Sequence, residues 1–192
     1  MEIARKIYAF LLDAVQTLLV AAAVFLVIYM FLFRPFEVNG ESMHGDYPKY
    51  NFYDKEYVLT NLIALRFGNP KLGDVVVFKA PPPNQEKDYI KRVIGVAGDS
   101  VMVKDGNVYL NNQLLDESTF LKSDVKTYTG AFLKEGEAVT VPTGEYFVMG
   151  DNRSYSSDSR EWGFIKQDEL IGESFLVYWP VSDIRFVSNP YK

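Results

Sequence analysis

Asp74-Val75-Val76-Val77-Phe78-Lys79 is the stretch that decides the fold class, because three β-branched residues and a phenylalanine stand in a row between charged ends. A short run of this composition predicts a β-strand. Further β-rich runs, separated by turn residues, cover 89–96, 100–103, 108–110, 139–141, 146–149, 175–179 and 184–187. Asp105-Gly106 predicts the turn of a hairpin between two of them. The chain beyond residue 35 is therefore predicted to be mainly β.

The segments between these runs predict loops. Pro81-Pro82-Pro83-Asn84 is expected to join two neighbouring strands. Residues 116–137 are polar and irregular, which predicts a surface excursion inside a less regular region at about 100–143. Only Lys166 to Leu170 indicates a short helical turn.

An uncharged run of 20 residues, Ala14 to Phe33, precedes the β-rich part. A helix over this run is about 30 Å long, the thickness of a bilayer hydrocarbon core. Arg34-Pro35 is expected to end it. A cleaved secretion signal would have a shorter apolar run with small residues after it, whereas 21–23, Ala-Ala-Ala, lie in the middle here. A buried core helix would be shorter or amphipathic. The run therefore predicts a single transmembrane anchor.

Charges beside the anchor predict its orientation. Arg5 and Lys6 precede the span, and Arg34 follows it. The positive-inside tendency then favours a cytoplasmic N-terminus. We expect residues 1–34 to form a short cytoplasmic tail and the anchor in the cell membrane, and residues 35–192 to form an extracytoplasmic β domain.

Composition excludes several kinds of chemistry. The chain has no cysteine and one histidine, His44. A thiol nucleophile, a disulfide framework and a zinc site built on thiolates or several histidines are therefore excluded, and we expect no metal and no cofactor. The net charge is −5, without a basic stripe, so no nucleic-acid partner is expected.

Three clusters carry the candidate chemistry, although each also has an ordinary structural interpretation. Residues 36–43 end in Gly-x-Ser, which is also how a plain strand can end in a turn. Residues 89–95 place Lys91 on one strand face with Tyr89 and Val93, where it is either buried or an edge lysine reaching water. Residues 149–163 concentrate hydroxyls, acids and arginines, as in a hydrated loop or in an ordered network that orients a catalytic group.

Together with the anchor, these clusters resemble the sequence boxes of the bacterial signal peptidase I family, in the same order and over most of the chain. The matching boxes are Ser42-Met43, the Gly-Asp-x-Val-Val-Phe strand at 73–78, Lys-Arg-Val-Ile-Gly at 91–95, and Gly-Asp-Asn-Arg-x-x-Ser-x-Asp-Ser-Arg at 150–160. The last box is highly specific, and all of its fixed positions are present. The resemblance implies an antiparallel β catalytic domain of the signal peptidase and LexA-like type. It also implies a serine endopeptidase that removes signal peptides from exported preproteins.

The resemblance further implies a role for individual residues. Ser42 is the nucleophile of acyl-enzyme chemistry, Lys91 is its general base, and Ser156 hydrogen-bonds and orients the Lys91 amine. A supporting polar shell contains Tyr89, Arg92, Asp151, Asp158 and Arg160. The implied substrates are preproteins cut after small-x-small sequences such as Ala-x-Ala. Residues flanking the dyad that could contact them are Val38, Gly40, Met43 and Ile90. Exposed aromatics such as Phe36, Trp162 or Phe164 are candidates for contact with the bilayer.

The chain departs from the family pattern at two places. After Ser42-Met43 the family usually continues x-Pro-Thr, whereas here the sequence is His44-Gly45-Asp46, so a differently shaped loop is expected. Gly40 stands where some relatives carry a serine whose hydroxyl helps the oxyanion hole. The hole is therefore expected to use the Ser42 backbone N–H and another amide.

Elementary chemistry supports a lysine base. A serine hydroxyl needs a base to take its proton, and with no spare histidine that base is a carboxylate, a tyrosine or a lysine. A lysine with the ordinary pKa of about 10.4 is neutral in only about one molecule in a thousand at pH 7, so its pKa must fall by roughly 2–3 units. Burial against apolar side chains lowers it in this way. We therefore expect Lys91 to be dry, within hydrogen-bond reach of Ser42, and free of a carboxylate partner. His44 is expected to be a surface turn residue.

Parts of the sequence are also compatible with three other functions. A self-cleaving LexA-type regulator would carry a DNA-binding helical region in place of the anchor. A β-lactamase or penicillin-binding enzyme is suggested by the S-x-x-K match at 123–126, but the other boxes of that fold are missing. The alternative that stays open is a membrane-anchored, non-catalytic β domain that binds a protein partner.

Overall fold

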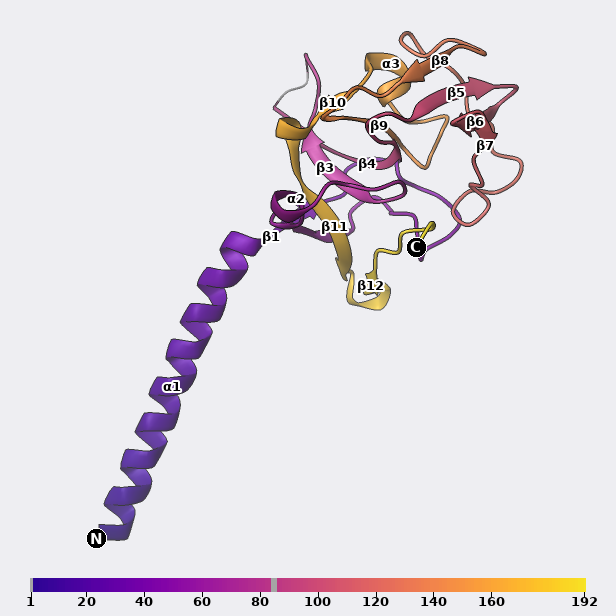
Figure 1. Ribbon diagram of the computed structural model, residues 1–192. Coiled ribbons are helices and arrows are strands. Elements are labelled where there is room, and N and C mark those ends of the chain that lie inside the picture. Colours follow the sequence, from indigo (N-terminus) through magenta and orange to yellow (C-terminus); the bar gives the residue numbers. More distant parts are fainter. Residues whose placement is uncertain (1, 84–85) are drawn as a thin grey trace.

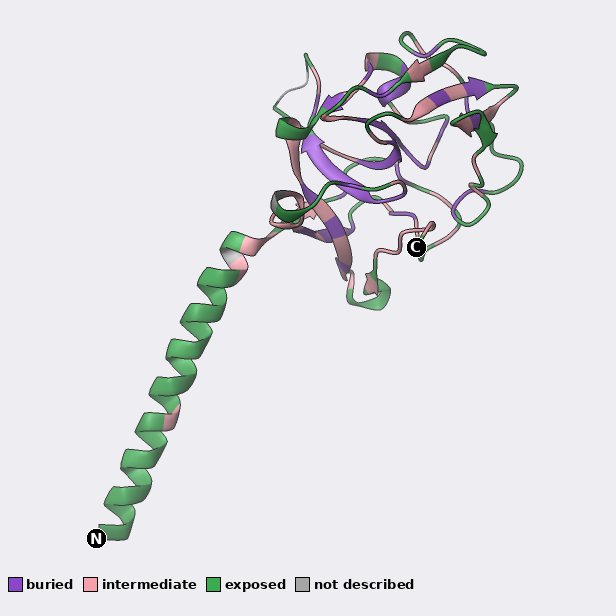
Figure 2. Cartoon of the chain, viewed as in Figure 1, coloured by how far each residue is buried: buried purple, intermediate pink, exposed green. Residues whose placement is uncertain are grey.

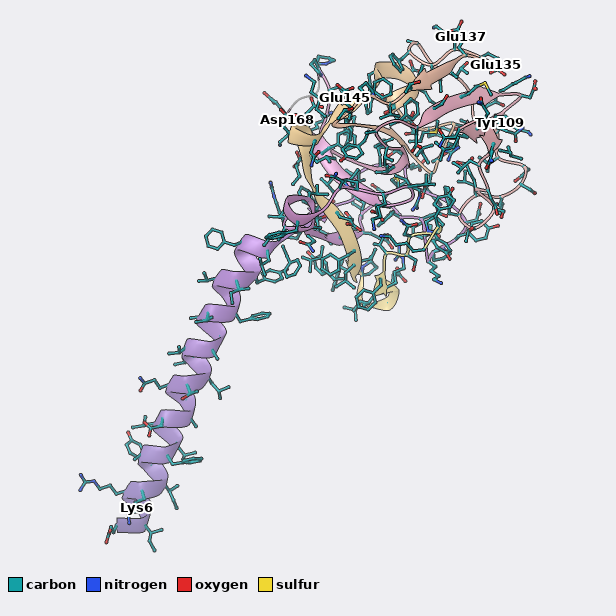
Figure 3. The ribbon with its side chains drawn as sticks, viewed as in Figure 1. Lys6, Tyr109, Glu135, Glu137, Glu145 and Asp168 are labelled. Atoms are coloured by element: carbon teal, nitrogen blue, oxygen red, sulfur yellow. The ribbon has the colours of Figure 1, made fainter. Side chains whose placement is uncertain are left out.

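The computed structural model describes residues 2–83 and 86–192, and consists of one long helix leading into a β domain (Figure 1). The helix, α1 (Glu2–Leu32), is long and apolar enough to cross a membrane, with a mean hydropathy of 2.4 in its most apolar window. It ends at Leu32, one residue before the predicted end of the span at Phe33, and begins 12 residues before the predicted start at Ala14. Its side chains stand clear of the β domain along almost its whole length (Figures 2 and 3).

The larger sheet is antiparallel throughout its described pairs and has eight strands. In the order β1-β2-β11-β3-β4-β9-β10, with β12 beside β11, it contains β1 (Phe33–Glu37), β2 (Tyr57–Asn61), β11 (Leu170–Trp179), β3 (Val75–Lys79), β4 (Asp88–Gly95), β9 (Glu145–Met149), β10 (Ile165–Lys166) and β12 (Arg185–Phe186). The helix α1 thus passes directly into an edge strand, β1, which pairs with β2.

A second, four-stranded sheet lies at the far end of the domain from α1 (Figure 1). Its order is β7-β6-β5-β8, from β7 (Gln113–Leu114), β6 (Asn107–Leu110), β5 (Ser100–Lys104) and β8 (Ala138–Thr140). The hairpin between β5 and β6 turns at Asp105 and Gly106, both with positive φ, as the Asp-Gly pair predicted. Residues 115–137 contain no helix or strand. The short helices are α2 (Ala64–Phe67), α3 (Ser159–Trp162), η1 (Gln167–Glu169) and η2 (Val181–Asp183).

Most of the secondary structure agrees with the sequence predictions. Every predicted β run overlaps an observed strand, and the predicted turn at Lys166–Leu170 contains η1. Pro81 to Pro83 lie in the loop between β3 and β4, while Asn84 is outside the described residues. The predictions missed β2, β7, β10 and the short helices α2, α3 and η2.

The central strand β3 is buried on both faces, and this explains its uninterrupted apolar run. Val75 belongs to a core cluster with Val38 and Met43, whereas Val76 and Phe78 belong to another with Val93. The first cluster packs beneath the segment that follows β1, where Ser42 lies. Phe36, Trp162 and Phe164, the candidates for bilayer contact, are partly exposed and pack against the core clusters.

Candidate active site

Ser42 lies in a turn that follows β1, and the conformation of Gly40 and two backbone hydrogen bonds fix this turn. Gly40 has φ of +92°, a conformation that favours glycine and lets the chain turn sharply. Met43 is completely buried and its carbonyl accepts a hydrogen bond from the Phe52 N–H at 2.9 Å. The Ser42 carbonyl accepts one from the Asn152 N–H at 3.0 Å. The hydroxyl is therefore presented from a well-anchored backbone.

Lys91 lies in β4, in the middle of the larger sheet, with only 4% of its surface exposed. Its Nζ donates to Ser42 Oγ at 2.6 Å and to the Ile90 carbonyl at 3.1 Å. The ring of Tyr89 lies 5.4 Å from the amine, on the strand face predicted for both residues. Unprotonated, the amine is at a distance where it can accept the Ser42 proton instead.

Burial lowers the pKa of Lys91 to about 8. The nearby charges of Asp158 and Asp151 oppose this effect, and the charge of Arg160 adds to it. Among residues 2–83 and 86–192, no carboxylate lies within ion-pair distance of the amine. Lys91 is thus dry, next to Ser42 and free of an acidic partner, which are the conditions that a lysine base requires.

Each acid that could hold Lys91 in its charged form is neutralised by an arginine. Arg92 binds Asp151 through two hydrogen bonds, of 2.8 and 2.6 Å, and both side chains are fully buried. Arg160 binds Asp158 through two of 2.7 Å. Burial alone would raise the pKa of Asp158, but the Arg160 guanidinium overcomes this and holds the pKa below its usual value. The carboxylates therefore exert only a weakened field on Lys91.

One contact implied by the family resemblance is not formed. Ser156 was expected to hydrogen-bond the Lys91 amine, but within the described residues that amine donates only to Ser42 Oγ and the Ile90 carbonyl, and the Ser156 hydroxyl lies near Asp158, where it helps to lower the pKa of that carboxyl. The hydroxyl is instead turned toward Gly150, where it occupies the space that a Cβ would need. The Ser156 side chain is near the Ser42 turn, since the same space is also bounded by the Ser42 carbonyl.

Two structural contacts escaped sequence analysis because their partners are far apart in the chain. The buried side chain of Asn51 donates to Asp151 at 2.8 Å and accepts from the Tyr47 N–H, so it ties the loop after Ser42 to the buried ion pair. It lies against Gly45, where a Cβ would overlap it, and this gives the departure at 44–46 a structural reason. Glu117, from the polar excursion, forms a two-point ion pair with Arg153.

His44 takes no part in this arrangement. Its ring is exposed and packs edge-on against Tyr53 at 5.0 Å between centroids, and no hydrogen bond joins it to the described residues around Lys91. It is a surface residue, as predicted.

A cavity of about 280 Å³ opens beside the Ser42 hydroxyl. Three of the four predicted substrate-contacting residues line it, namely Val38, Gly40 and Ile90. The fourth, Met43, does not: its side chain is turned inward at the Ser42 turn and packs in the core cluster with Phe52 and Val58. The cavity also has Phe36, Val58, Val77, Tyr155 and Ser157 in its walls.

A family model for signal peptidase, peptidase S26, matches residues 11–179. The chain belongs to the signal peptidase family. Signal peptidase IB of Staphylococcus aureus is 33% identical over 191 residues, which cover 94% of this chain and 95% of that protein. Probable signal peptidase I-2 of Synechocystis is 36% identical over 131 residues, 66% of this chain and 56% of that protein. A signal peptidase I crystal structure from Enterococcus faecalis is 31% identical, covering 55% of this chain and 97% of that one, with a TM-score of 0.42.

Membership in this family confirms several predictions together. The chain is a hydrolase of the signal peptidase I type, its family activity is signal peptide processing, and its fold is a mainly antiparallel β domain behind one apolar helix. The S-x-x-K match is a coincidence, because both Ser123 and Lys126 are exposed residues of the irregular excursion.

Proposed function

We propose that this signal peptidase cleaves preproteins through a Ser42–Lys91 dyad, with its catalytic domain on the outer side of the cytoplasmic membrane. The observation that carries the proposal is the 2.6 Å contact between a nearly dry lysine amine and the Ser42 hydroxyl. Perturbed ionisable groups beside a cavity and a nucleophile are the signature of a catalytic site.

The contacts support the following mechanism. Neutral Lys91 removes the Ser42 proton as Oγ attacks the carbonyl carbon of the scissile peptide bond. The resulting ammonium then gives this proton to the leaving amine, and the acyl group stays on Ser42. Lys91 next removes a proton from water as the water oxygen attacks the ester carbonyl, and it returns this proton to Ser42 Oγ as the bond from Oγ to the acyl carbon breaks and the cleaved signal peptide leaves as a carboxylate. Among the described residues the Ser42 N–H has no acceptor, so it is available to the oxyanion.

The substrate is proposed to add as an extended strand beside β4. Residues 88–91 pair with β3 on one side, whereas β9 joins the other side of β4 only from Arg92 onward. The open edge faces the cavity beside Ser42, and the chain at 36–41 lines the other side of that cavity. Backbone pairing of this kind gives affinity, and side-chain pockets give specificity. The walls formed by Val38 and Ile90 fit small apolar residues of a small-x-small site.

Residues 1–34 serve in this proposal as cytoplasmic tail and anchor, and residues 35–192 as the extracytoplasmic domain. The anchor holds the site near the surface where preprotein cleavage sites emerge, which raises the effective concentration of substrate. Phe67 of α2, Trp179 at the end of β11 and Phe186 of β12 are exposed aromatics suited to contact with lipid headgroups. The non-catalytic alternative is disfavoured by Lys91, because burying an amine without an acidic partner destabilises a domain that has no use for it.

A cleavage assay on the full chain in detergent tests the proposal. A preprotein with an Ala-x-Ala site is expected to be cut after the second alanine, and replacing that alanine with a bulky residue such as phenylalanine is expected to lower kcat/KM at least about a hundredfold, since overpacking a closed pocket costs roughly 3 kcal/mol. A metal chelator is expected to leave the rate unchanged. Equal cleavage of both substrates would refute the proposed pocket, and no cleavage of either would favour the binding domain.

A further inference from the structure

A second cavity, of about 510 Å³, lies on the other side of the Ser42 turn. It is formed between the loop that follows Ser42, the polar excursion and the loop after β9. Residues from these three segments that line it include Glu41, His44, Asp46, Lys126, Asn152 and Ser154. None of the functional roles argued above uses this cavity.

The two cavities adjoin at Glu41, which lines both of them and directly precedes Ser42 in the chain, whereas Ser42 itself lines only the first. Asn152, in the wall of the second cavity, donates its N–H to the Ser42 carbonyl at 3.0 Å. A peptide whose scissile carbonyl sits on Ser42 Oγ therefore has one cavity for the residues before the bond and another for the residues after it.

We propose that the second cavity binds the first residues of the mature protein, and that Glu41 selects against an acidic side chain there. This inference rests on the proposed dyad function, and deepens it by adding the leaving-group side of the substrate. The first cavity has the apolar walls that suit the small residues of the signal peptide. The second therefore takes the mature segment.

The charges of the second cavity set its preference. Asp46 and Lys122 form an ion pair of 2.9 Å and largely cancel each other. Glu41 is exposed, and within the described residues it forms no ion pair. Of the charged residues described in the walls of the second cavity, Glu41 alone also lines the first and directly precedes Ser42, while Asp124 and Lys126 bring charges of opposite sign. An acidic substrate residue just after the bond meets like charge there, whereas a basic one meets opposite charge.

The charge preference is tested with two substrates that differ only in lysine or glutamate at the second residue after the bond. The lysine substrate is expected to have a kcat/KM roughly two- to fivefold higher at low salt, the size of an exposed charge interaction, and the difference is expected to shrink in 1 M salt. Glu41→Gln is expected to remove the difference. Glu137→Gln is the matched control, since Glu137 is an exposed residue at the outer edge of the smaller sheet, away from both cavities (Figure 3). An unchanged preference in Glu41→Gln would overturn the role of Glu41.

Occupancy of the cavity is tested separately by filling it. Ser154→Trp places a bulky side chain in the wall of the second cavity from an exposed loop position. It is expected to lower kcat/KM on the order of tenfold for a substrate with six residues after the bond, and to spare one whose leaving group is a small arylamine, since roughly 1.4 kcal/mol of binding is lost only in the first. Equal effects on both substrates, or none on either, would overturn the assignment.

A cross-linking measurement does not depend on turnover. In Ser42→Ala protein, a photoreactive group at the second residue after the bond is expected to label segments 122–128 or 152–154. Labelling of β1 or β4 instead would place the mature segment in the first cavity and overturn the inference.

If the unmodified protein cuts neither the long substrate nor the arylamide, the dyad function fails, and the cavity inference fails with it. If the unmodified protein cuts both substrates, and Glu41→Gln and Ser154→Trp cut them as the unmodified protein does, the dyad function stands and only the assignment of the second cavity is wrong.

Discussion

Ser42→Ala and Lys91→Met are each expected to lower kcat/KM for preprotein cleavage by at least about a thousandfold, as removal of a nucleophile or its base does in other serine hydrolases. Ser42→Ala removes the attacking oxygen. Lys91→Met keeps a side chain of similar length in the buried site, but removes the lone pair that accepts the proton. The double variant is expected to be no worse than either single one, since the two groups act as a unit. Initial rates on a preprotein in detergent measure all three.

Lys91→Met is also expected to stabilise the fold while it abolishes activity. The folded-state pKa of about 8 lies below the ordinary 10.5, so at pH 7 the folded protein holds a charge that the unfolded chain holds more easily. This shift in pKa lowers the free energy of unfolding by roughly 3 kcal/mol, and we expect Lys91→Met to restore about 1–3 kcal/mol of it at pH 7. The penalty is fully present below pH 8 and is lost as the pH rises from 8 to 10.5, so the gain should shrink over that range.

Urea unfolding of the full chain at pH 7 and pH 10 measures this gain. Lys104→Met is the matched control, because Lys104 is an exposed strand lysine in β5 and should change neither stability nor activity. If Lys91→Met retains substantial activity, or if it destabilises the protein at pH 7, Lys91 is not a dry base.

Asp151→Ala is expected to lower the free energy of unfolding by about 3–5 kcal/mol, because it leaves the Arg92 guanidinium buried and uncompensated. For a domain of this size the melting temperature should fall by roughly 6–20 °C. The side chain of Asn51 would lose its acceptor as well, so the loop after Ser42 loosens with it. Thermal unfolding followed by circular dichroism measures the shift.

An exposed ion pair provides the comparison for Asp151→Ala. Lys79 and Asp88 are 2.6 Å apart but half of the lysine is in solvent, so Lys79→Met should cost less than about 1 kcal/mol. The pair Arg92→Met and Asp151→Leu together should recover much of the loss, since no unpaired charge remains. A loss in Asp151→Ala as small as that in Lys79→Met would show that the buried pair does not hold the site together.

These two predictions concern features that the sequence reveals to different degrees. The long apolar helix and most of the strands could be predicted, because an uncharged 20-residue run and β-branched runs are strong local signals. β7 and β10 could not, because two-residue strands carry no periodic pattern. Ser42 and Lys91 were identified through the resemblance. The contact between them requires the Ser42 turn to lie against β4. The two residues are 49 positions apart in the chain, and composition and spacing do not predict that they meet.

The contacts that surround the dyad could not be predicted from the sequence. Arg92 and Asp151 were expected near the dyad, yet nothing in the sequence showed that they bind each other or that Asn51, 100 residues away, binds the same carboxylate. Met43 was expected in the substrate pocket because of its position, but the direction of its side chain is set by the turn. The expected contact of Ser156 with the Lys91 amine is likewise not formed among the described residues, where the Ser156 hydroxyl lies beside Gly150.

The proposed mechanism requires Lys91 in the folded protein to release its proton far more readily than a lysine side chain in water does. Nuclear magnetic resonance of isotopically labelled lysine in the detergent-solubilised chain, with the Lys91 signal assigned by its absence in Lys91→Met, measures this directly. We predict a titration midpoint at about pH 8, so that the neutral base becomes populated as the pH rises through that value. A midpoint at or above the ordinary lysine value would contradict the account.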